Sequence, residues 1–202
     1  MNLPMKDKKG LPKPVEAVFG FIETLFITML IVSLIFTYVF RITSVTGESM
    51  SKTLESGDKV VITTFCKNPK QGDIVVFYAA ESVTFDDENN LLINPGLRRN
   101  LVKRIIATEG QTVDFDFEKG IVYIDGEIFI EDYISGLTHS DSGAFTGKYP
   151  ITVPEGYVFV MGDNRRNSID SRSYEIGFVA VDNIIGKVIV RLTPFSSMGF
   201  LE

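Results

Sequence analysis

The sequence contains few of the residues on which common metal and catalytic sites depend. Its 202 residues include one cysteine, Cys66, one histidine, His139, and no tryptophan. A single cysteine excludes an internal disulfide and a thiolate-rich zinc or iron–sulfur centre, and a single histidine excludes every multi-histidine metal site. These counts leave almost no conventional metal site available, and a Ser-His-Asp triad would have to use His139.

The sequence also has fewer basic than acidic residues. Lys and Arg total 20 against 26 Asp and Glu, which gives a net charge of −6. Domains that bind nucleic acid carry a basic patch or stripe, so we expect no nucleic-acid partner. Hydrophobic residues make up 45% of the chain and charged residues 23%. These shares are ordinary for a folded domain and exclude general disorder.

The first 40 residues divide into a basic tail and a long apolar run. Residues 1–14 hold four lysines and one aspartate, and residues 15–40 carry no charge after Glu23. About 20 apolar residues cross a bilayer, and this run exceeds the hydrophobic region of a signal peptide. The sequence predicts a single-pass anchor at 15–40 in the cell membrane; a buried core helix and a cleaved signal peptide are the alternatives. The positive-inside rule makes 1–14 a cytoplasmic tail and places 41–202 on the outer side of the cytoplasmic membrane.

Residues 41–202 have the pattern of an antiparallel β domain, so the predicted fold is mainly β with an N-terminal transmembrane helix. β-branched and aromatic runs alternate with Gly, Pro, Asn and Asp turn signals. Asp125-Gly126 predicts a two-residue hairpin. Two polar stretches, 82–100 and 135–149, predict excursions from the sheet. The expected strands are 59–65, 73–79, 101–107, 112–117, 121–125, 157–161 and 186–192.

Two segments supply a candidate nucleophile and a candidate base. Ser49 follows the apolar run within VTGESMSKTL, and Lys103 lies in the apolar strand LVKRII. Because strand residues alternate between faces, one of the adjacent cations Lys103 and Arg104 must point inward. A serine in a turn more often caps backbone groups, and a strand lysine more often extends to water. A desolvated lysine, however, has a lowered pKa and can take a proton from a serine near neutral pH.

A third segment, 161–187, is unusually rich in polar groups for a stretch that directly follows an apolar strand. Oppositely charged side chains alternate within ten positions, which favours a hydrogen-bonded scaffold around a site over a solvated surface loop. The polar residues concerned are Asp163, Asn164, Arg165, Ser168, Asp170, Ser171 and Arg172.

With these segments the chain resembles the bacterial type I signal peptidases, membrane-anchored serine proteases that remove signal peptides from secreted preproteins. The resemblance covers about residues 15–200. Four segments match the family's motif boxes in order: GESMSKTL (47–54), GDIVVF (72–77), VKRIIATEGQTV (102–113) and GDNRRNSIDSR (162–172).

The resemblance implies roles for individual residues. Ser49 is expected to be the nucleophile and Lys103 the general base, acting through an acyl-enzyme intermediate without a metal or any other cofactor. The hydroxyl of Ser168 is expected to orient the lysine. Asp170 and Arg172 are expected to form an ion pair that supports the site beside the carboxylate of Asp163.

The expected partners are the lipid bilayer and the signal peptides of exported preproteins. An extended substrate would pair as an added strand and place small side chains, at the first and third positions before the cut, in shallow apolar pockets. The apolar residues beside the two catalytic candidates could line those pockets or belong to the core; they are Val45, Met50, Leu54 and Val102. A housekeeping peptidase and a peptidase specialised for a few substrates would share all these residues, so the residues do not distinguish the two.

The chain departs from the family pattern at several positions. Lys52 stands where the nucleophile box normally has proline, and Ala107, Glu109 and Gln111 replace glycine, proline and aspartate in the lysine box. Some relatives place a serine at the position of Gly47 to help stabilise the oxyanion, so the main expected donor here is the amide of Ser49.

Two other classes of protein remain open from the sequence. Ser49-Met50-Ser51-Lys52 fits S-x-x-K, the signature of penicillin-binding proteins and class A β-lactamases, in which Lys52 would be the base. Those enzymes have a long helix after the serine, whereas LESGDKVV contains turn residues, and no K-T-G follows on a later strand. The other class is a membrane-anchored β module that binds a partner without catalysis.

Overall fold

The structure is a computed structural model that describes residues 12–64 and 68–201. The chain divides between Phe40 and Arg41 into two compact units, which are described separately. Cys66 and most of the predicted basic tail lie outside the described residues.

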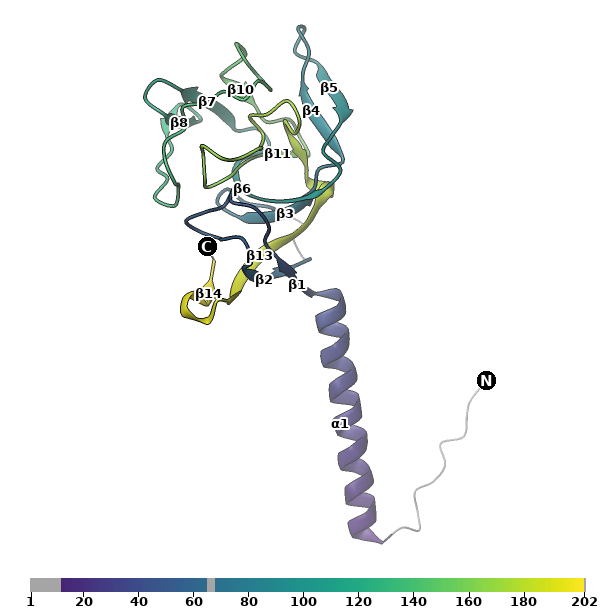
Figure 1. Ribbon diagram of the computed structural model, residues 1–202. Coiled ribbons are helices and arrows are strands. Elements are labelled where there is room, and N and C mark those ends of the chain that lie inside the picture. The colour runs from purple at the N-terminus through teal and green to yellow at the C-terminus, as the bar shows by residue number, and fades with distance from the viewer. Residues whose placement is uncertain (1–11, 65–67, 202) are drawn as a thin grey trace, which may run out of the picture. The chain divides into compact units, whose positions relative to one another are not determined.

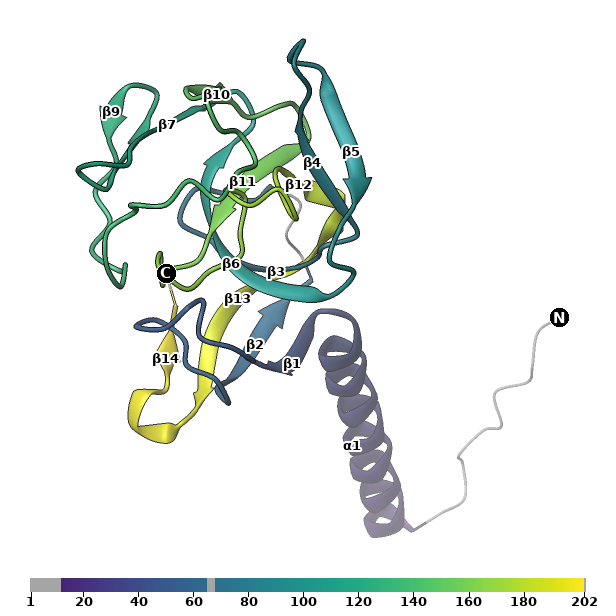
Figure 2. The same cartoon turned by 45° about the horizontal axis from the view of Figure 1, so that its top comes forward.

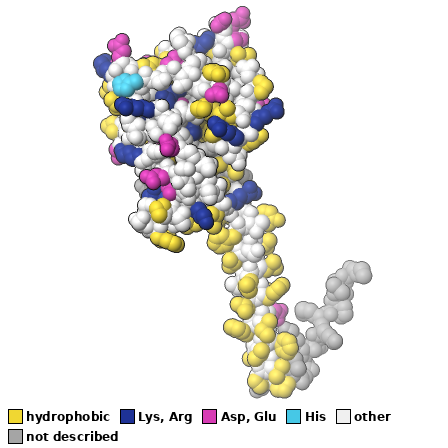
Figure 3. All heavy atoms as spheres, in the orientation of Figure 1, with side chains coloured by type: hydrophobic (Ala, Val, Ile, Leu, Met, Phe, Trp, Pro, Cys, Tyr) yellow, Lys and Arg dark blue, Asp and Glu magenta, His cyan; other side chains and the backbone are white. Residues whose placement is uncertain are grey.

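The predicted anchor is one continuous helix, α1 (Lys13–Tyr38). Pro14 lies in its first turn, where a missing backbone N–H costs no intrahelical hydrogen bond. At about 1.5 Å per residue the helix is about 39 Å long, more than the roughly 30 Å hydrocarbon core of a bilayer. Its large apolar side chains are exposed, and Figure 3 shows them along the length of α1. By length and composition α1 can therefore span a membrane.

The second unit is built on an antiparallel sheet, which confirms the predicted fold class. The sheet order is β1-β2-β13-β3-β6-β11-β12, with β14 also paired to β13 (Figure 1). The bounds are β1 (Phe40–Ser44), β2 (Lys59–Thr63), β3 (Ile74–Tyr78), β6 (Asn100–Thr108), β11 (Tyr157–Met161), β12 (Val179–Ala180), β13 (Ile184–Thr193) and β14 (Gly199–Phe200). Two short 3₁₀ helices, η1 (Val181–Asn183) and η2 (Phe195–Ser197), flank β13.

Two smaller sheets complete the unit, one of four strands and one of two. The four-stranded sheet has the order β10-β7-β8-β9, formed by β7 (Thr112–Asp116), β8 (Ile121–Ile124), β9 (Glu127–Ile128) and β10 (Ile151–Thr152). Asp125 and Gly126 join β8 to β9 with φ of 54° and 82°, so the predicted hairpin turn is confirmed.

The two predicted excursions have different structures. Within 82–100 lies most of a separate hairpin, β4 (Glu81–Phe85) with β5 (Leu91–Pro95), whose strands run side by side in Figures 1 and 2. Residues 135–149 contain turns and one isolated bridge, from Gly143 to Ser173.

Both faces of the central strand pair β3–β6 are covered. Val75 and Phe77 of β3 pack in one buried cluster, against which Leu101 of β6 lies. Ile74 and Val76 pack in a second cluster together with the apolar residues Val45, Met50, Leu54, Val60, Ile62 and Val188. The second cluster joins the segment around Ser49 to the sheet, and so positions the candidate nucleophile over β6.

Candidate active site

Ser49 lies in a tight turn that two buried apolar side chains hold against the sheet. The backbone N–H groups of Thr53 and Leu54 donate to the carbonyl of Met50 at 3.0 and 2.8 Å. Met50 and Leu54 are buried on either side of the turn. The sequence therefore forms a short, rigid turn after Ser49 instead of the long helix that the S-x-x-K alternative requires.

Lys103 of β6 reaches this turn from the middle of the main sheet. Its Nζ donates to Ser49 Oγ at 2.7 Å and to the carbonyl of Val102 at 3.1 Å. The side chain is 2% exposed. Burial lowers the pKa of Lys103 from 10.5 to about 8; the field of Asp170 opposes the shift and the nearby Arg99 adds to it. A sizeable fraction of Lys103 is thus neutral near pH 8, with its nitrogen next to a serine hydroxyl.

Arg104 is buried as well, at 3% exposure, although alternation along a strand requires only one of the two cations to point inward. Both are inside because β6 is covered on both faces. The Arg104 Nε and Nη2 atoms donate to the two carboxylate oxygens of Asp163 at 3.0 and 2.9 Å. Thr53 Oγ1 donates to the same carboxylate at 2.6 Å. Asp163 therefore links β6 to the turn that carries Ser49.

The predicted ion pair between Asp170 and Arg172 is formed and fully buried. Arg172 Nε and Nη2 donate to the two oxygens of Asp170, each at 2.9 Å, and the Gly162 N–H donates to Asp170 at 3.0 Å. Burial alone would raise the pKa of Asp170, but the charge of Arg172 and these hydrogen bonds outweigh it, and the pKa lies below its ordinary value. Asp170 stays ionised at neutral pH and contributes a negative field at Lys103.

Ser168 and Gly162 meet beside the nucleophile. A Cβ atom on Gly162 would lie 2.7 Å from Ser168 Cβ and even closer to Ser168 Oγ and the carbonyl oxygen of Ser49. The hydroxyl of Ser168 is buried and lies close enough to Asp170 to help lower the pKa of that carboxylate. The ammonium of Lys103 has three N–H donors, and its hydrogen bonds to Ser49 and Val102 use two of them.

A segment that the sequence analysis did not single out, 131–135, is also tied to this site. Arg165 binds Glu131 as a buried ion pair, with Nη1 donating to Oε2 at 2.6 Å. The ring of Tyr133 lies 4.0 Å from the guanidinium carbon of Arg104, and the Ser135 N–H donates to the carbonyl of Asp163 at 2.7 Å. The segment follows an ordinary hairpin, and its sequence has no pattern that signals these contacts.

Lys52 points away from Ser49. Its Nζ donates to the carbonyl oxygens of Asp132 and Ile134, the second at 3.2 Å. The backbone φ of Lys52 is 92°. Proline, with φ fixed near −65°, could not adopt this conformation, which explains how the turn differs from the family pattern at this position. The geometry provides no support for Lys52 as the base.

An open cleft of about 370 Å³ leads to Ser49 and Lys103. The other residues that line it are Thr46, Gly47, Glu48, Arg99, Asn100, Leu101, Asn167 and Ile169. The expected pocket residues Val45, Met50 and Leu54 are buried in the core beneath this cleft, while Val102 is half-buried. Leu101 and Ile169 are apolar cleft residues that the sequence analysis did not identify.

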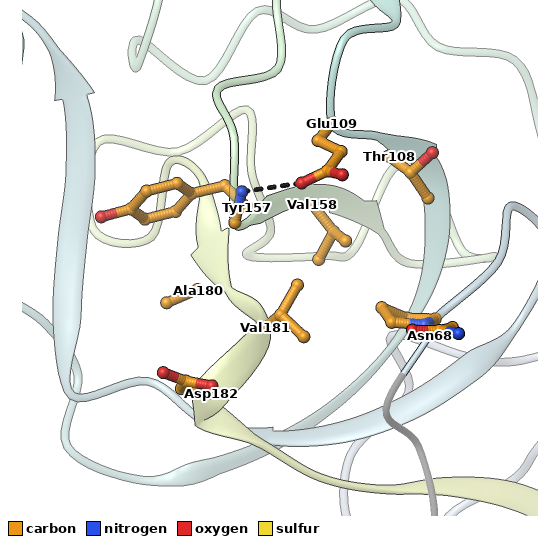
Figure 4. Close-up of a pocket in the computed structure, with 10 residues that line it drawn as sticks. Asn68, Thr108, Glu109, Tyr157, Val158, Ala180, Val181 and Asp182 are labelled. Atoms are coloured by element: carbon orange, nitrogen blue, oxygen red, sulfur yellow. Dashed lines mark hydrogen bonds between the residues drawn. The ribbon is translucent and has the colours of Figure 1, made fainter.

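A larger cavity, of about 620 Å³, contains none of the predicted site residues (Figure 4). Glu109 in its wall accepts a hydrogen bond from the Gly156 N–H at 2.9 Å. His139 is exposed, with Nδ1 3.0 Å from the carbonyl of Phe117, and takes no part in the contacts around Ser49. Within residues 12–64 and 68–201, no three His, Cys, Asp or Glu side chains are arranged to hold a metal ion.

The sequence model of the family described as "Signal peptidase, peptidase S26" matches residues 18–193. The chain belongs to this family, whose members remove signal peptides, and the resemblance found in the sequence is confirmed. It is therefore an enzyme of the signal peptidase I family, which excludes the penicillin-binding class and the non-catalytic β module.

Two relatives agree with this assignment, and one solved structure is similar over part of the chain. The chain is 34% identical to a probable signal peptidase I-1 from Synechocystis sp., across 95% of this chain and 90% of the relative. It is 31% identical to signal peptidase I P from Bacillus subtilis subsp. natto, across 90% and 91%. A solved signal peptidase I from Enterococcus faecalis is 28% identical and covers 60% of this chain and 97% of its own, with a TM-score of 0.43.

Proposed function

We propose that this chain is a membrane-anchored serine endopeptidase that removes N-terminal signal peptides with Ser49 as nucleophile and Lys103 as general base. The observation that carries the proposal is the 2.7 Å contact between Ser49 Oγ and the buried Nζ of Lys103, whose pKa is lowered to about 8. An amine that is partly neutral near physiological pH can accept the serine proton without a histidine.

The proposed reaction is acyl transfer in two steps. Neutral Lys103 takes the proton of Ser49 Oγ, which attacks the scissile carbonyl carbon, and the lysine ammonium then gives the proton to the leaving amine. The resulting ester is hydrolysed by a water molecule that Lys103 deprotonates. The negative oxygen of each tetrahedral intermediate needs hydrogen-bond donors, and the backbone amide of Ser49 is the one that the turn presents beside Oγ.

The surrounding residues have supporting roles in this proposal. Asp170 and Arg172 hold the backbone at Gly162, and Asp163 holds the turn of Ser49 through Thr53. The buried hydroxyl of Ser168, which lies beside Gly162 and Asp170, is proposed to accept an N–H of Lys103 and so to orient the amine toward Ser49. These contacts fix the geometry on which nucleophile and base depend.

The substrate is proposed to bind as an added strand on β6. Within the described strands, β11 pairs with β6 only from Arg104 to Thr108, whereas β3 pairs with it from Asn100 to Arg104. The edge of β6 before Lys103 therefore has free backbone groups that lead to the nucleophile. An extended peptide can pair there, with alternate side chains directed toward Val102 and the apolar cluster below it.

The first test is cleavage of a model preprotein by the purified full-length chain in detergent. Product should form at the signal-peptide junction, and a Ser49→Ala variant should form none. Because the base must be neutral, kcat/KM should rise with pH and reach half its maximum near pH 8, the pKa of Lys103. A profile that rises only near pH 10.5 would contradict a desolvated lysine base.

The anchor and its orientation are tested separately. Helix α1 is proposed to cross the cell membrane once, with the lysines of 1–14 in the cytoplasm and residues 41–202 outside. Protease added to wall-stripped intact cells should digest residues beyond 50 and spare an epitope tag fused before residue 1. Digestion of the tag, with 41–202 spared, would show the opposite orientation.

A further inference from the structure

The two walls of the cleft beside Ser49 carry opposite charges. Glu48, in the turn, accepts a hydrogen bond from Asn167 Nδ2 at 3.3 Å. Arg99, on the opposite wall, is exposed and forms no ion pair with any residue in 12–64 or 68–201. An arginine that lines a substrate cleft without a carboxylate partner has its five donors available to a ligand.

The position of Arg99 on the sheet defines which side of a bound peptide it faces. The Ala79 N–H donates to the carbonyl of Arg99 at 3.0 Å, so the β3–β6 ladder extends one residue before Asn100. Strand alternation then places Arg99 on the same side as Leu101. Leu101 packs toward the cluster of Val75 and Phe77, and Val102 packs toward the opposite cluster.

The same alternation applies to a peptide added at the edge of β6. If the first and third residues before the cut face the side of Val102, the second and fourth face the side of Leu101 and Arg99. Arg99 precedes Val102 by three residues, about 10 Å at roughly 3.3 Å per residue. A peptide that runs parallel to β6 with its first residue before the cut opposite Val102 therefore has its fourth residue before the cut opposite Arg99.

We propose that Arg99 determines a substrate preference, by selecting preproteins with an acidic side chain at the fourth residue before the cut. This inference depends on the proposed function and on the proposed strand pairing. A carboxylate at that position would pair with the unpartnered guanidinium, whereas a lysine would meet a like charge. The position is solvent-accessible, so the preference should be moderate and should weaken at high salt.

The test uses one preprotein with Asp, Asn or Lys at the fourth position before the cut. The wild-type chain should cleave the Asp substrate about fivefold faster in kcat/KM than the Lys substrate, the fold-change expected of an exposed ion pair. Arg99→Glu should reverse the order. Arg98→Glu is the matched control, because it changes the net charge equally but Arg98 lines a separate hollow with Tyr78 and Ile93. It should keep the wild-type order.

The remaining outcomes separate the two hypotheses. Equal cleavage of all three substrates by the wild-type chain would overturn the role of Arg99 and leave the proposed function standing. The same holds for a charge preference that Arg99→Glu does not reverse, or one found at the third or fifth position in a parallel series. Failure to cleave any of the substrates would instead count against the proposed function itself.

Discussion

Lys103→Ala should be as inactive as Ser49→Ala, with the rate of preprotein cleavage lowered by at least about 10⁴-fold in each. In the proposed mechanism the two side chains act as one unit across their 2.7 Å contact, so removal of either leaves the other without a function. Within the described residues Lys103 forms no ion pair, so its removal leaves no buried charge unpaired. Both variants should therefore fold, which circular dichroism would check, and single-turnover cleavage assays would measure the loss.

Lys52→Ala is the matched control for the identity of the base. Lys52 is exposed and binds carbonyl oxygens of the 131–135 segment, with no contact to Ser49 among the described residues. The variant should retain most of the activity and its pH profile. An inactive Lys52→Ala beside an active Lys103→Ala would refute the proposed mechanism. It would support Lys52 as the base, as in the S-x-x-K interpretation of residues 49–52.

Gly162→Ala should lower kcat by about 10²-fold or more while KM changes little. The added methyl group would overlap the side chain of Ser168 and the carbonyl oxygen of Ser49, and that carbonyl cannot move without displacing the nucleophile turn. A displacement of about 1 Å at a catalytic group can cost about 10²-fold in rate. Steady-state kinetics with one preprotein would separate the effects on kcat and KM.

Gly199→Ala is the control for the effect of a methyl group. No atom lies within 4 Å of the position that its Cβ would occupy, and Gly199 does not need a positive φ. This variant should have wild-type kinetics. If Gly162→Ala also proved fully active, the nucleophile turn would be more adaptable than the contacts around Gly162 imply.

The sequence was most informative about strands and about the two reactive side chains. Every expected strand overlaps a strand of the structure, because apolar alternation and turn residues are local signals. Residue types and strand alternation made Ser49 and Lys103 candidates for nucleophile and base, but only the resemblance joined two residues 54 positions apart in one site.

Other contacts could not be predicted from residue patterns. The burial of Arg104 depends on cover over both faces of β6, whereas strand alternation assumes one face in water. The Arg165–Glu131 pair joins two loops 34 positions apart, and neither loop has a periodic pattern. The hairpin of β4 and β5 was expected only as a polar excursion, because its turn residues 86–90 are acidic and rich in asparagine.

The bond between Thr53 and Asp163 has a consequence for when the enzyme becomes active during its synthesis. These residues are 110 positions apart, so the turn of Ser49 cannot acquire this support until most of the chain has been made. At roughly 5 to 20 residues per second, translation of that interval takes about 5 to 20 s. Under the proposed mechanism, a nascent chain that already contains Ser49 is therefore an inactive precursor, and proteolytic activity begins only after the last motif box has folded onto the first.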